Sequence, residues 1–238
     1  MTIAANPDPE FRLASPSLPE ADAYVFDIDG TLLVTEDLVH WNALHQAMLE
    51  AYGVDTTIEG IPYHGKTDPG ILRAALERAG VGGPQFRAGL TKALEVVSRE
   101  VDRNCRHISP RICPAVDRLL RSLRARDKLL GIASGNLESV GWHKIEAAGL
   151  RHFFAFGSFS DHRESRQEIF RHALEYVRGR LGPAARACFV GDTPSDVRAA
   201  KHVGSPILAV ASGTFNVGEL SACAPDVCVS HCGELFPD

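Results

Sequence analysis

The feature that most constrains the fold of this chain is a repeated unit: a short apolar run, then a loop, then a helix. Six apolar runs have the length of buried strands, and they cover residues 23–26, 129–133, 153–156, 187–190, 206–210 and 227–229. Most of them are separated by stretches with helical patterning, at residues 115–126, 137–148, 167–177 and 194–203. Buried strands that alternate with helices indicate a parallel sheet covered on both faces. The predicted fold is therefore a Rossmann-like, doubly wound parallel α/β sheet.

One region, from residue 38 to residue 104, breaks this alternation and shows only helical periodicity. Four large apolar residues recur there at steps of three and four, which places them on one helix face: Leu38, Trp41, Leu44 and Met48. Asp68 and Pro69 have the pattern of an N-cap followed by a first-turn proline. We therefore expect a small all-helical cap inserted after the first strand.

Composition limits the remaining organisation and the class of partner. Residues 1–21 carry Pro and acidic residues where a signal peptide requires an apolar run, so we interpret them as a flexible tail. The predicted core then comprises residues 22–37 and 108–238, and the cap residues 38–107. A net charge of -5 without a Lys/Arg run argues against nucleic acid. No stretch approaches the ~18 apolar residues of a membrane span, so we expect a cytoplasmic protein. We expect it to be a monomer or a homodimer.

The C-terminal cysteines raise the question of a structural zinc site. Cys223, Cys228 and Cys232 lie close together in sequence, and His231 adjoins the last of them. Their spacing contains no CxxC pair, and residues 227–229 have the pattern of a buried strand, in which Cys is a small hydrophobe. We expect neither a zinc site nor a disulfide framework.

The strongest functional signal is the sequence FDIDGT at residues 26–31. An apolar strand ends at Asp27, and open α/β sheets bind ligands outside the carboxyl ends of their strands. Asp27 and Asp29 can point into the same cleft, and Gly30 permits a tight turn. One carboxylate can then attack phosphorus while the other transfers the leaving-group proton. The alternative, a solvated acidic turn, does not account for the flanking strand and the Gly-Thr-Leu sequence.

Two further strand ends carry polar residues. In the sequence FVGDTPSD at residues 189–196, Asp192 and Asp196 bracket the start of a helix and offer the hard oxygen ligands that suit Mg²⁺. Helix capping would explain one of these acids but not both. After the run 129–133, Ser134 and nearby backbone N–H groups can hold phosphate oxygens at a helix N-terminus. Ser-Gly-Asn is also ordinary turn chemistry, so this second signal is open to either interpretation.

The order of these motifs resembles the haloacid dehalogenase superfamily, from about residue 23 to the C-terminus. The resemblance is carried by the DxDGT segment, a strand-end Ser about one hundred residues later, and the GDxxxD segment. The sequences GNLE at 135–138 and GDTPSD at 191–196 are most similar to the phosphoglycolate phosphatase-like branch. The resemblance implies a Rossmann-like core with a helical cap, in agreement with the pattern above.

The same resemblance implies roles for individual residues. Asp27 would be the nucleophile that forms an aspartyl-phosphate, Asp29 the general acid and base, and Ser134 a phosphate-orienting residue. Mg²⁺ would bind Asp27, the backbone carbonyl of Asp29 and Asp192, with Asp196 nearby. Three further residues are expected to contact the substrate: Thr31, Gly135 and Asn136.

The chain departs from the family pattern where a lysine usually precedes the helix before the GDxxxD strand. The sequence at residues 160–170 contains no lysine. We expect Arg166 to replace it, because it directly precedes the predicted helix, and a guanidinium binds phosphate and carboxylate well. One alternative is that Arg163 replaces the lysine. The other is that both arginines lie on a solvated helix end and neither replaces it.

The expected cap contributes the sequence HGKTD at residues 64–68. Lys66, and less directly His64, can bind a carboxylate or a second phosphate of the substrate, although an exposed loop that caps the next helix would have the same composition. The predicted function is hydrolysis of a small phosphorylated metabolite, such as phosphoglycolate or a sugar phosphate. A phosphosugar mutase and a non-catalytic binding domain are the alternatives, and C–Cl hydrolysis fits poorly because it has little use for Asp29 or a metal.

Overall fold

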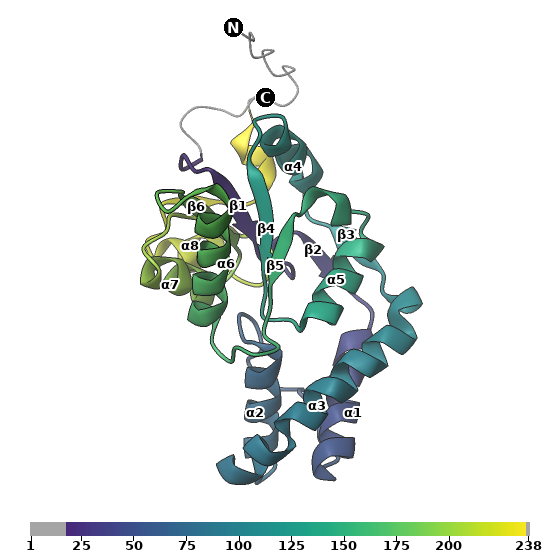
Figure 1. Cartoon of the computed structure of the whole chain (residues 1–238). Helices are drawn as coiled ribbons and strands as arrows, with labels where there is room; N and C mark the ends of the chain where they lie inside the picture. The colour runs from purple at the N-terminus through teal and green to yellow at the C-terminus, as the bar shows by residue number, and fades with distance from the viewer. Residues whose placement is uncertain (1–17, 237–238) are drawn as a thin grey trace, which may run out of the picture.

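A computed structural model of the protein describes residues 18–236 and contains a six-stranded parallel sheet (Figure 1). The strands are β1 (Ala23–Phe26), β4 (Leu129–Ala133), β5 (Phe156–Ser158), β6 (Ala187–Gly191), β7 (Ile207–Val210) and β8 (Val227–Val229). Their order across the sheet is β5-β4-β1-β6-β7-β8, and every neighbouring pair is parallel. The predicted doubly wound α/β sheet is confirmed.

The alternation of side chains along β1 explains why helices cover both faces of the sheet. Ala23 and Val25 point into a core shared with α6 (Arg166–Leu181), α7 (Pro194–His202) and α8 (Val217–Ser221). Tyr24 and Phe26 point into a second core, shared with α4 (Val116–Arg124) and α5 (Glu138–Ala147). Successive strand residues face opposite sides, so one short apolar run supplies both cores.

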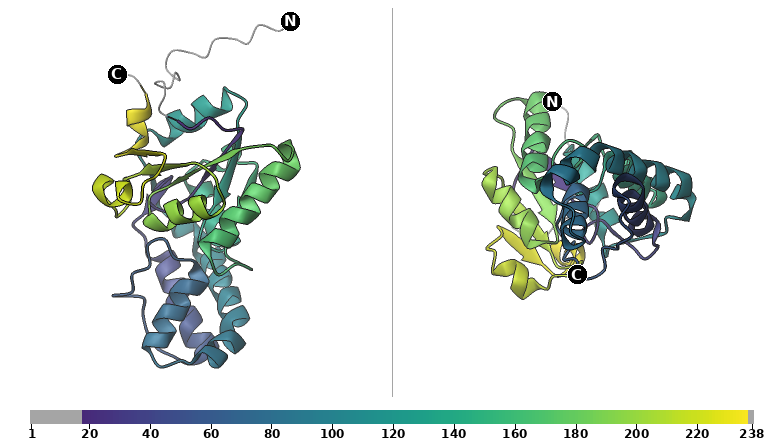
Figure 2. Two further views of the ribbon diagram at one scale, coloured as in Figure 1. Left: turned by 90° about the vertical axis from the view of Figure 1, so that its left-hand side faces the viewer. Right: turned by 90° about the horizontal axis from the view of Figure 1, so that it is seen from below.

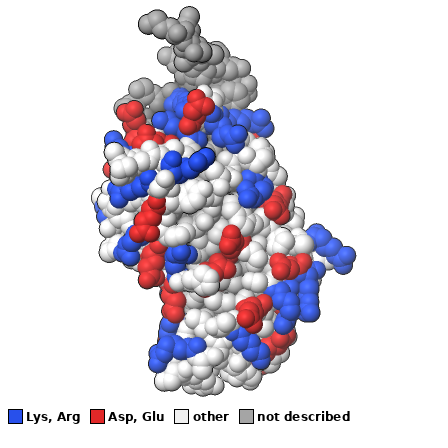
Figure 3. Space-filling model, viewed as in Figure 1, with Lys and Arg blue, Asp and Glu red and all other residues white. Residues whose placement is uncertain are grey.

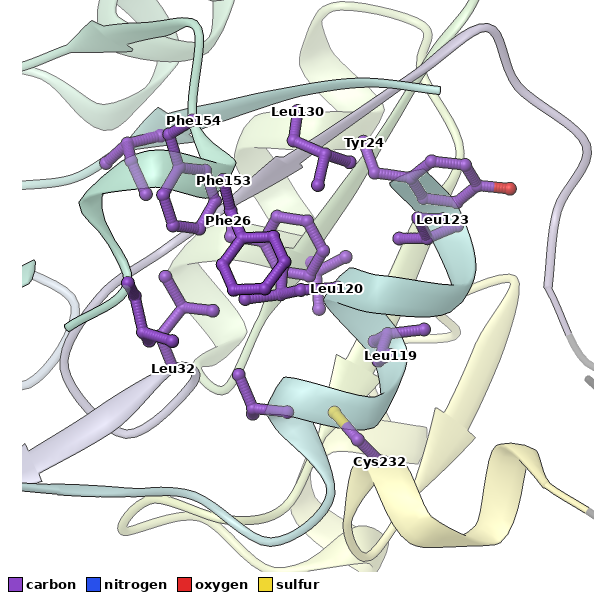
Figure 4. Close-up of a cluster of buried hydrophobic side chains, with 14 of the residues drawn as sticks. Tyr24, Phe26, Leu32, Leu119, Leu120, Leu123, Leu130, Phe153, Phe154 and Cys232 are labelled. Atoms are coloured by element: carbon purple, nitrogen blue, oxygen red, sulfur yellow. The ribbon is translucent and has the colours of Figure 1, made fainter. Parts of the chain in front are cut away.

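The second core also decides the environment of the C-terminal cysteines. Figure 4 shows Cys232 beside Leu119 of α4, in the same cluster as Tyr24 and Phe26. Cys232 belongs to the short 3-10 turn Cys232–Leu235 and is buried there as an apolar side chain. All six cysteines are free. Among residues 18–236, the cysteines and His231 form no group with metal-ligand spacing.

Three helices lie between β1 and α4: α1 (Val39–Tyr52), α2 (Asp68–Arg78) and α3 (Gly83–Asn104). They have a hydrophobic core of their own, which includes Leu44, Met48, Leu72, Val97 and Phe86. In Figures 1 and 2 this helical segment packs below the sheet, at one end of its strands. A short 3-10 turn, Cys105–His107, ends it.

Two short strands that the sequence pattern did not reveal connect this helical segment to the sheet. β2 (Leu33–Thr35) and β3 (Pro110–Ile112) pair antiparallel. Each is only three residues long, and β3 begins with a proline, so neither shows the apolar run of a buried strand. They hold the two chain connections of the helical segment side by side, and the segment therefore follows β2 rather than β1 directly.

Several local predictions are corrected by the structure. Residues 151–153 form a 3-10 turn, so β5 begins at Phe156, later than the apolar run at 153–156 predicted. β8 is half-buried rather than buried. The N-cap of α2 is Thr67, whose hydroxyl accepts a hydrogen bond from the Gly70 N–H at 3.1 Å, and not Asp68. Asp68 is instead buried and bonds outside its own helix.

Most of the predicted N-terminal tail, residues 1–17, lies outside the described residues. The part that the structure describes packs against the core: Ala21 is buried, and the Tyr24 hydroxyl donates to the Pro19 carbonyl at 2.8 Å. On the face shown in Figure 3, basic and acidic side chains are interspersed. No helix within residues 18–236 has the length and apolar character needed to cross a membrane.

Candidate active site

The polar residues at the strand ends meet in one cavity of about 660 Å³ between the sheet and the helical segment. The core contributes residues that follow β1, β4, β6 and β7, because the carboxyl ends of parallel strands lie at the same edge of a sheet. The helical segment contributes an opposite wall that includes His40, Trp41, Tyr63 and Lys66. The topology therefore unites segments separated by more than one hundred residues.

Arg166 binds Asp27, the expected nucleophile, and Asp196, which was expected near the metal. It is the first residue of α6, where Ser165 forms a capping box with Glu168. Its Nε donates to Asp196 Oδ1 at 2.6 Å, and its Nη2 lies 2.5 Å from Asp27 Oδ2 in an ion pair. Of the two candidate arginines, Arg166 is the one that makes these contacts. Its side chain is only 5% exposed, so these charges interact with little screening by water.

Asp192 is held against the loop that follows β1. The hydroxyl of Thr31 donates to Asp192 Oδ1 at 3.0 Å. Thr31 is buried and does not line the cavity, and its contact with the substrate stays a prediction. Gly30 has a φ of +81°, and a Cβ there would lie 2.2 Å from Asp192 Oδ2. Only glycine permits this approach of the backbone to the carboxylate.

Asp27, Asp192 and Asp196 form a buried acidic group suited to a cation. One oxygen of each lies within 4.8 Å of the others, and within the described part of the chain no other His/Cys/Asp/Glu group of this kind exists. Both oxygens of Asp196 are already bonded, to Arg166 and to the Thr193 N–H and hydroxyl. Asp27 Oδ1 is buried without a hydrogen-bond partner. Asp27 and Asp192 are therefore the residues with oxygen available to a metal.

The electrostatics of this group support the same conclusion. Burial raises the pKa of Asp27 to about 6; Arg166 opposes this rise, and Asp196 and Asp29 add to it. Burial, together with repulsion from Asp27 and Asp196, raises the pKa of Asp192 well above its usual value. Three carboxylates face one guanidinium, so two negative charges are uncompensated when all three are ionised. A divalent cation with oxygen ligands fits this charge and these donors.

The carboxylate of Asp29 lies apart from this acidic group and is bound by Lys144. Lys144 Nζ donates to both oxygens of Asp29, at 2.9 and 2.8 Å, and Asn136 Nδ2 donates to Oδ2 at 2.7 Å. Burial acts to raise the pKa of Asp29, but the Lys144 charge and the hydrogen bonds from Lys144 and Asn136 lower it overall. The side chain is 44% exposed and lines the cavity.

Lys144 is the residue of the site that the sequence interpretation missed. It lies on α5, and its side chain is 5% exposed. The signal that could have revealed it is helical spacing: Val140, Gly141 and Ile145 share the buried face of α5 with Lys144. A lysine at an apolar-face position is almost never buried without a partner.

The three residues after β4 have different environments. Ser134 is buried, and its hydroxyl oxygen accepts from Asn136 Nδ2 at 3.0 Å. Gly135 is packed against the chain that leads into α2: its carbonyl accepts from the Asp68 N–H at 2.8 Å, and a Cβ on it would lie 2.4 Å from the Lys66 carbonyl oxygen. All three residues line the cavity, and Asn136 also bonds to Asp29 and Lys144.

The loop before α2 lies on the strand ends of the core. Gly65 has a φ of +74°, and a Cβ there would lie 2.8 Å from Thr193 Oγ1. His64 Nδ1 lies 3.1 Å from the Thr214 hydroxyl oxygen. Burial lowers the pKa of this histidine. Lys66 lines the cavity and is exposed, so it can meet a ligand that enters.

Comparison with known proteins identifies the family. A model described as "Hydrolase: haloacid dehalogenase-like hydrolase" matches residues 21–204. The chain belongs to this family. A phosphoglycolate phosphatase from Synechococcus elongatus is 32% identical over 206 residues, which cover 86% of this chain and 90% of the relative. One from Mesorhizobium japonicum is 29% identical over 217 residues, with 87% and 89% covered.

A solved structure agrees with the fold. CbbY from Rhodobacter sphaeroides, in a mutant form in complex with xylulose-(1,5)bisphosphate, has a TM-score of 0.68 and 17% identity, and covers 92% of this chain and 100% of that chain. At this identity the likeness concerns the fold alone. The family and the sequence relatives together identify the protein as a phosphoric monoester hydrolase similar to phosphoglycolate phosphatases.

Proposed function

We propose that this haloacid dehalogenase-like hydrolase is a Mg²⁺-dependent phosphatase that works through an aspartyl-phosphate on Asp27. The observation that carries the proposal is the Asp27 carboxylate at the end of β1, whose Oδ1 is buried without a hydrogen-bond partner and so is left for a cation. It belongs to a residue that lines the cavity beside Arg166. A nucleophile must lie beside the group that it attacks, and Arg166, which is paired with Oδ2, can hold a phosphate dianion next to this carboxylate.

The proposed first step transfers the phosphoryl group to the enzyme. The Asp27 oxygen forms a bond to phosphorus, the bond from phosphorus to the leaving oxygen breaks, and Asp29 supplies the proton that this oxygen takes up. A phosphate dianion bound beside Asp29 raises the pKa of that carboxyl and favours the protonated form that this step needs. Arg166 and the Ser134 hydroxyl can bind the transferred oxygens.

In the second step water attacks phosphorus, its proton passes to Asp29, and the bond to Asp27 breaks, which releases inorganic phosphate. Bound Mg²⁺, held by Asp27 and Asp192, would neutralise negative charge on the transferred group. Asp196 orients Arg166 and caps α7, as its hydrogen bonds indicate. The backbone carbonyl of Asp29 remains a proposed third ligand.

We further propose that residues 38–107 act as the cap and residues 22–37 and 108–238 as the catalytic core. The separate hydrophobic core of α1–α3 supports this division. The substrate is a small phosphorylated metabolite such as phosphoglycolate, as the names of the relatives suggest. Lys66 is the cap cation best placed to bind its carboxylate, because it is exposed and lines the cavity.

The test is phosphate release from a panel of phosphorylated metabolites, with Mg²⁺ and with EDTA, by the wild type and Asp27→Asn. We expect Asp27→Asn to lose activity by about 10³-fold or more, because an amide is a poor nucleophile. Asp127→Asn is the matched control, since Asp127 is exposed in a turn and has a φ of 55°, which Asn tolerates.

Four results would contradict the proposal. Wild-type turnover by Asp27→Asn would exclude the nucleophile, and full activity after exhaustive EDTA treatment would exclude the metal. Rapid isomerisation of a sugar 1-phosphate, with a catalytic amount of its bisphosphate and negligible phosphate release, would identify a mutase instead. No turnover on any substrate would favour a binding domain.

A further inference from the structure

Lys144 is a buried charged residue that the proposed reaction does not use. Its ammonium contacts both oxygens of Asp29, and its third contact within the core is Asn136 Oδ1 at 3.2 Å. Asn136 in turn donates to Asp29 at 2.7 Å and to the Ser134 hydroxyl at 3.0 Å. Two donors from different residues therefore fix the carboxylate of Asp29, which stands on a loop directly before Gly30.

The helical segment completes this network through His40 of α1. Lys144 Nζ lies 3.3 Å from His40 Nδ1. An ammonium can only donate, so Nδ1 accepts and the ring proton is on Nε2. Nε2 lies 3.2 Å from Asp68 Oδ2, at the start of α2, in close contact but without the geometry of a hydrogen bond. A chain of contacts thus runs from α2 through α1 to Lys144 and Asp29.

The same carboxylate of Asp68 also fixes the helix that carries Lys144. Asp68 Oδ2 accepts from the N–H of Leu137, the N-cap residue of α5, at 2.8 Å. Leu137 and Lys144 are two helical turns apart, so they lie on the same face of α5. The helical segment therefore contacts α5 at both points, through Asp68 at Leu137 and through His40 at Lys144.

We propose that Lys144 is a positioning residue for Asp29, and that His40 makes this positioning depend on the docking of the helical segment. The inference rests on the proposed role of Asp29 as acid and base. Without the ammonium, the carboxylate can rotate on its loop and is less often placed for proton transfer. Lys144 does not contact Asp27, so formation of the bond from Asp27 to phosphorus does not depend on it directly.

This division between the two steps gives a specific expectation. A strongly basic leaving group needs the proton that Asp29 supplies in the first step. The attacking water needs Asp29 as a base in the second step. p-Nitrophenolate is a weak base and departs without a proton. Lys144→Met should therefore slow phosphate release from either kind of substrate. The release of p-nitrophenolate from its phosphate ester should stay within about threefold of wild type, because general acid–base catalysis acts only where a proton is transferred.

The experiment is single turnover with enzyme in excess and Mg²⁺ present. p-Nitrophenolate release reports the first step, and phosphate release the second. We expect Lys144→Met to slow phosphate release about 10- to 100-fold, which is less than the full contribution of an acid–base group. His40→Gln should give the same pattern with a smaller loss. Lys128→Met, next to the start of β4 and far from its carboxyl end at Ala133, should match wild type.

Asp29→Asn separates failure of this inference from failure of the proposed function. If Asp29→Asn does not slow phosphate release selectively, the acid–base role itself is wrong. If Asp29→Asn does so but Lys144→Met slows both steps equally, or neither, only the positioning role is refuted. If Lys144→Met does not fold, His40→Gln decides: a selective loss supports the proposal, and an equal effect on both steps overturns it.

Discussion

Replacing Arg166 with Met tests whether this guanidinium neutralises the buried acids of the active site. The change removes the only cation that contacts Asp27 and Asp196 among the described residues, while the side chain remains of similar length. Both carboxylates would stay buried, with 6% and 0% of their side chains exposed. Removing one partner from a buried ion pair costs about 3–5 kcal/mol, because the remaining charge is left without compensation.

The magnitude can be read from the melting temperature of the metal-free protein. For a chain of this size, 1 kcal/mol corresponds to roughly 2–4 °C, so we expect Arg166→Met to melt about 6–20 °C below wild type at pH 7 in EDTA. The loss should shrink at pH 5. Without the guanidinium, the pKa of Asp27 rises further, so more of this carboxyl is protonated at pH 5 than at pH 7. A protonated carboxyl carries no buried charge, and its burial therefore destabilises the folded protein less.

Thermal denaturation of wild type, Arg166→Met and Arg163→Met, at both pH values, is the assay. Arg163 precedes α6 by a few residues in the same segment, so it controls for loss of a positive charge from this region. Two results would refute the reasoning: a melting temperature of Arg166→Met within about 2 °C of wild type, or a larger loss in Arg163→Met. In either case Arg166 would not compensate the acidic group.

Two further predictions concern the same group of acids. Burial raises the pKa of Asp27 to about 6, so between pH 4 and pH 6 this residue is protonated more in the folded protein than in the unfolded chain. Its contribution to the stability of the metal-free protein should therefore fall as the pH rises through this range, and Mg²⁺ should abolish this fall. Melting temperatures across this range, with EDTA and with Mg²⁺, check this, and identical curves would contradict a metal site. Gly30→Ala should destabilise the protein and weaken Mg²⁺ binding measured by calorimetry, because its Cβ would lie 2.2 Å from Asp192 Oδ2 at a φ of +81°. Gly149→Ala, which has a similar φ but open space around it, separates backbone strain from this contact.

Sequence by itself determined the class of fold and the location of the site. Apolar runs such as 23–26 can be recognised because a strand buried on both faces must be apolar throughout. Gly149 and Gly204 end helices because their φ values of +71° and +67° favour glycine. The acids at 27, 29 and 192 follow strands, and parallel topology alone brings such positions to one edge of the sheet.

Only the tertiary structure decided which partner each of these side chains has. The Thr31 hydroxyl donates to Asp192, where the sequence suggested a substrate contact, and Asp68 accepts from the Leu137 N–H, where the sequence suggested a helix cap. Lys144 was not recognised because its partner Asp29 is 115 residues away. Local propensity reports on neighbours within a few residues, whereas the pairing of a buried charge depends on how α5, α1 and the loop after β1 pack together.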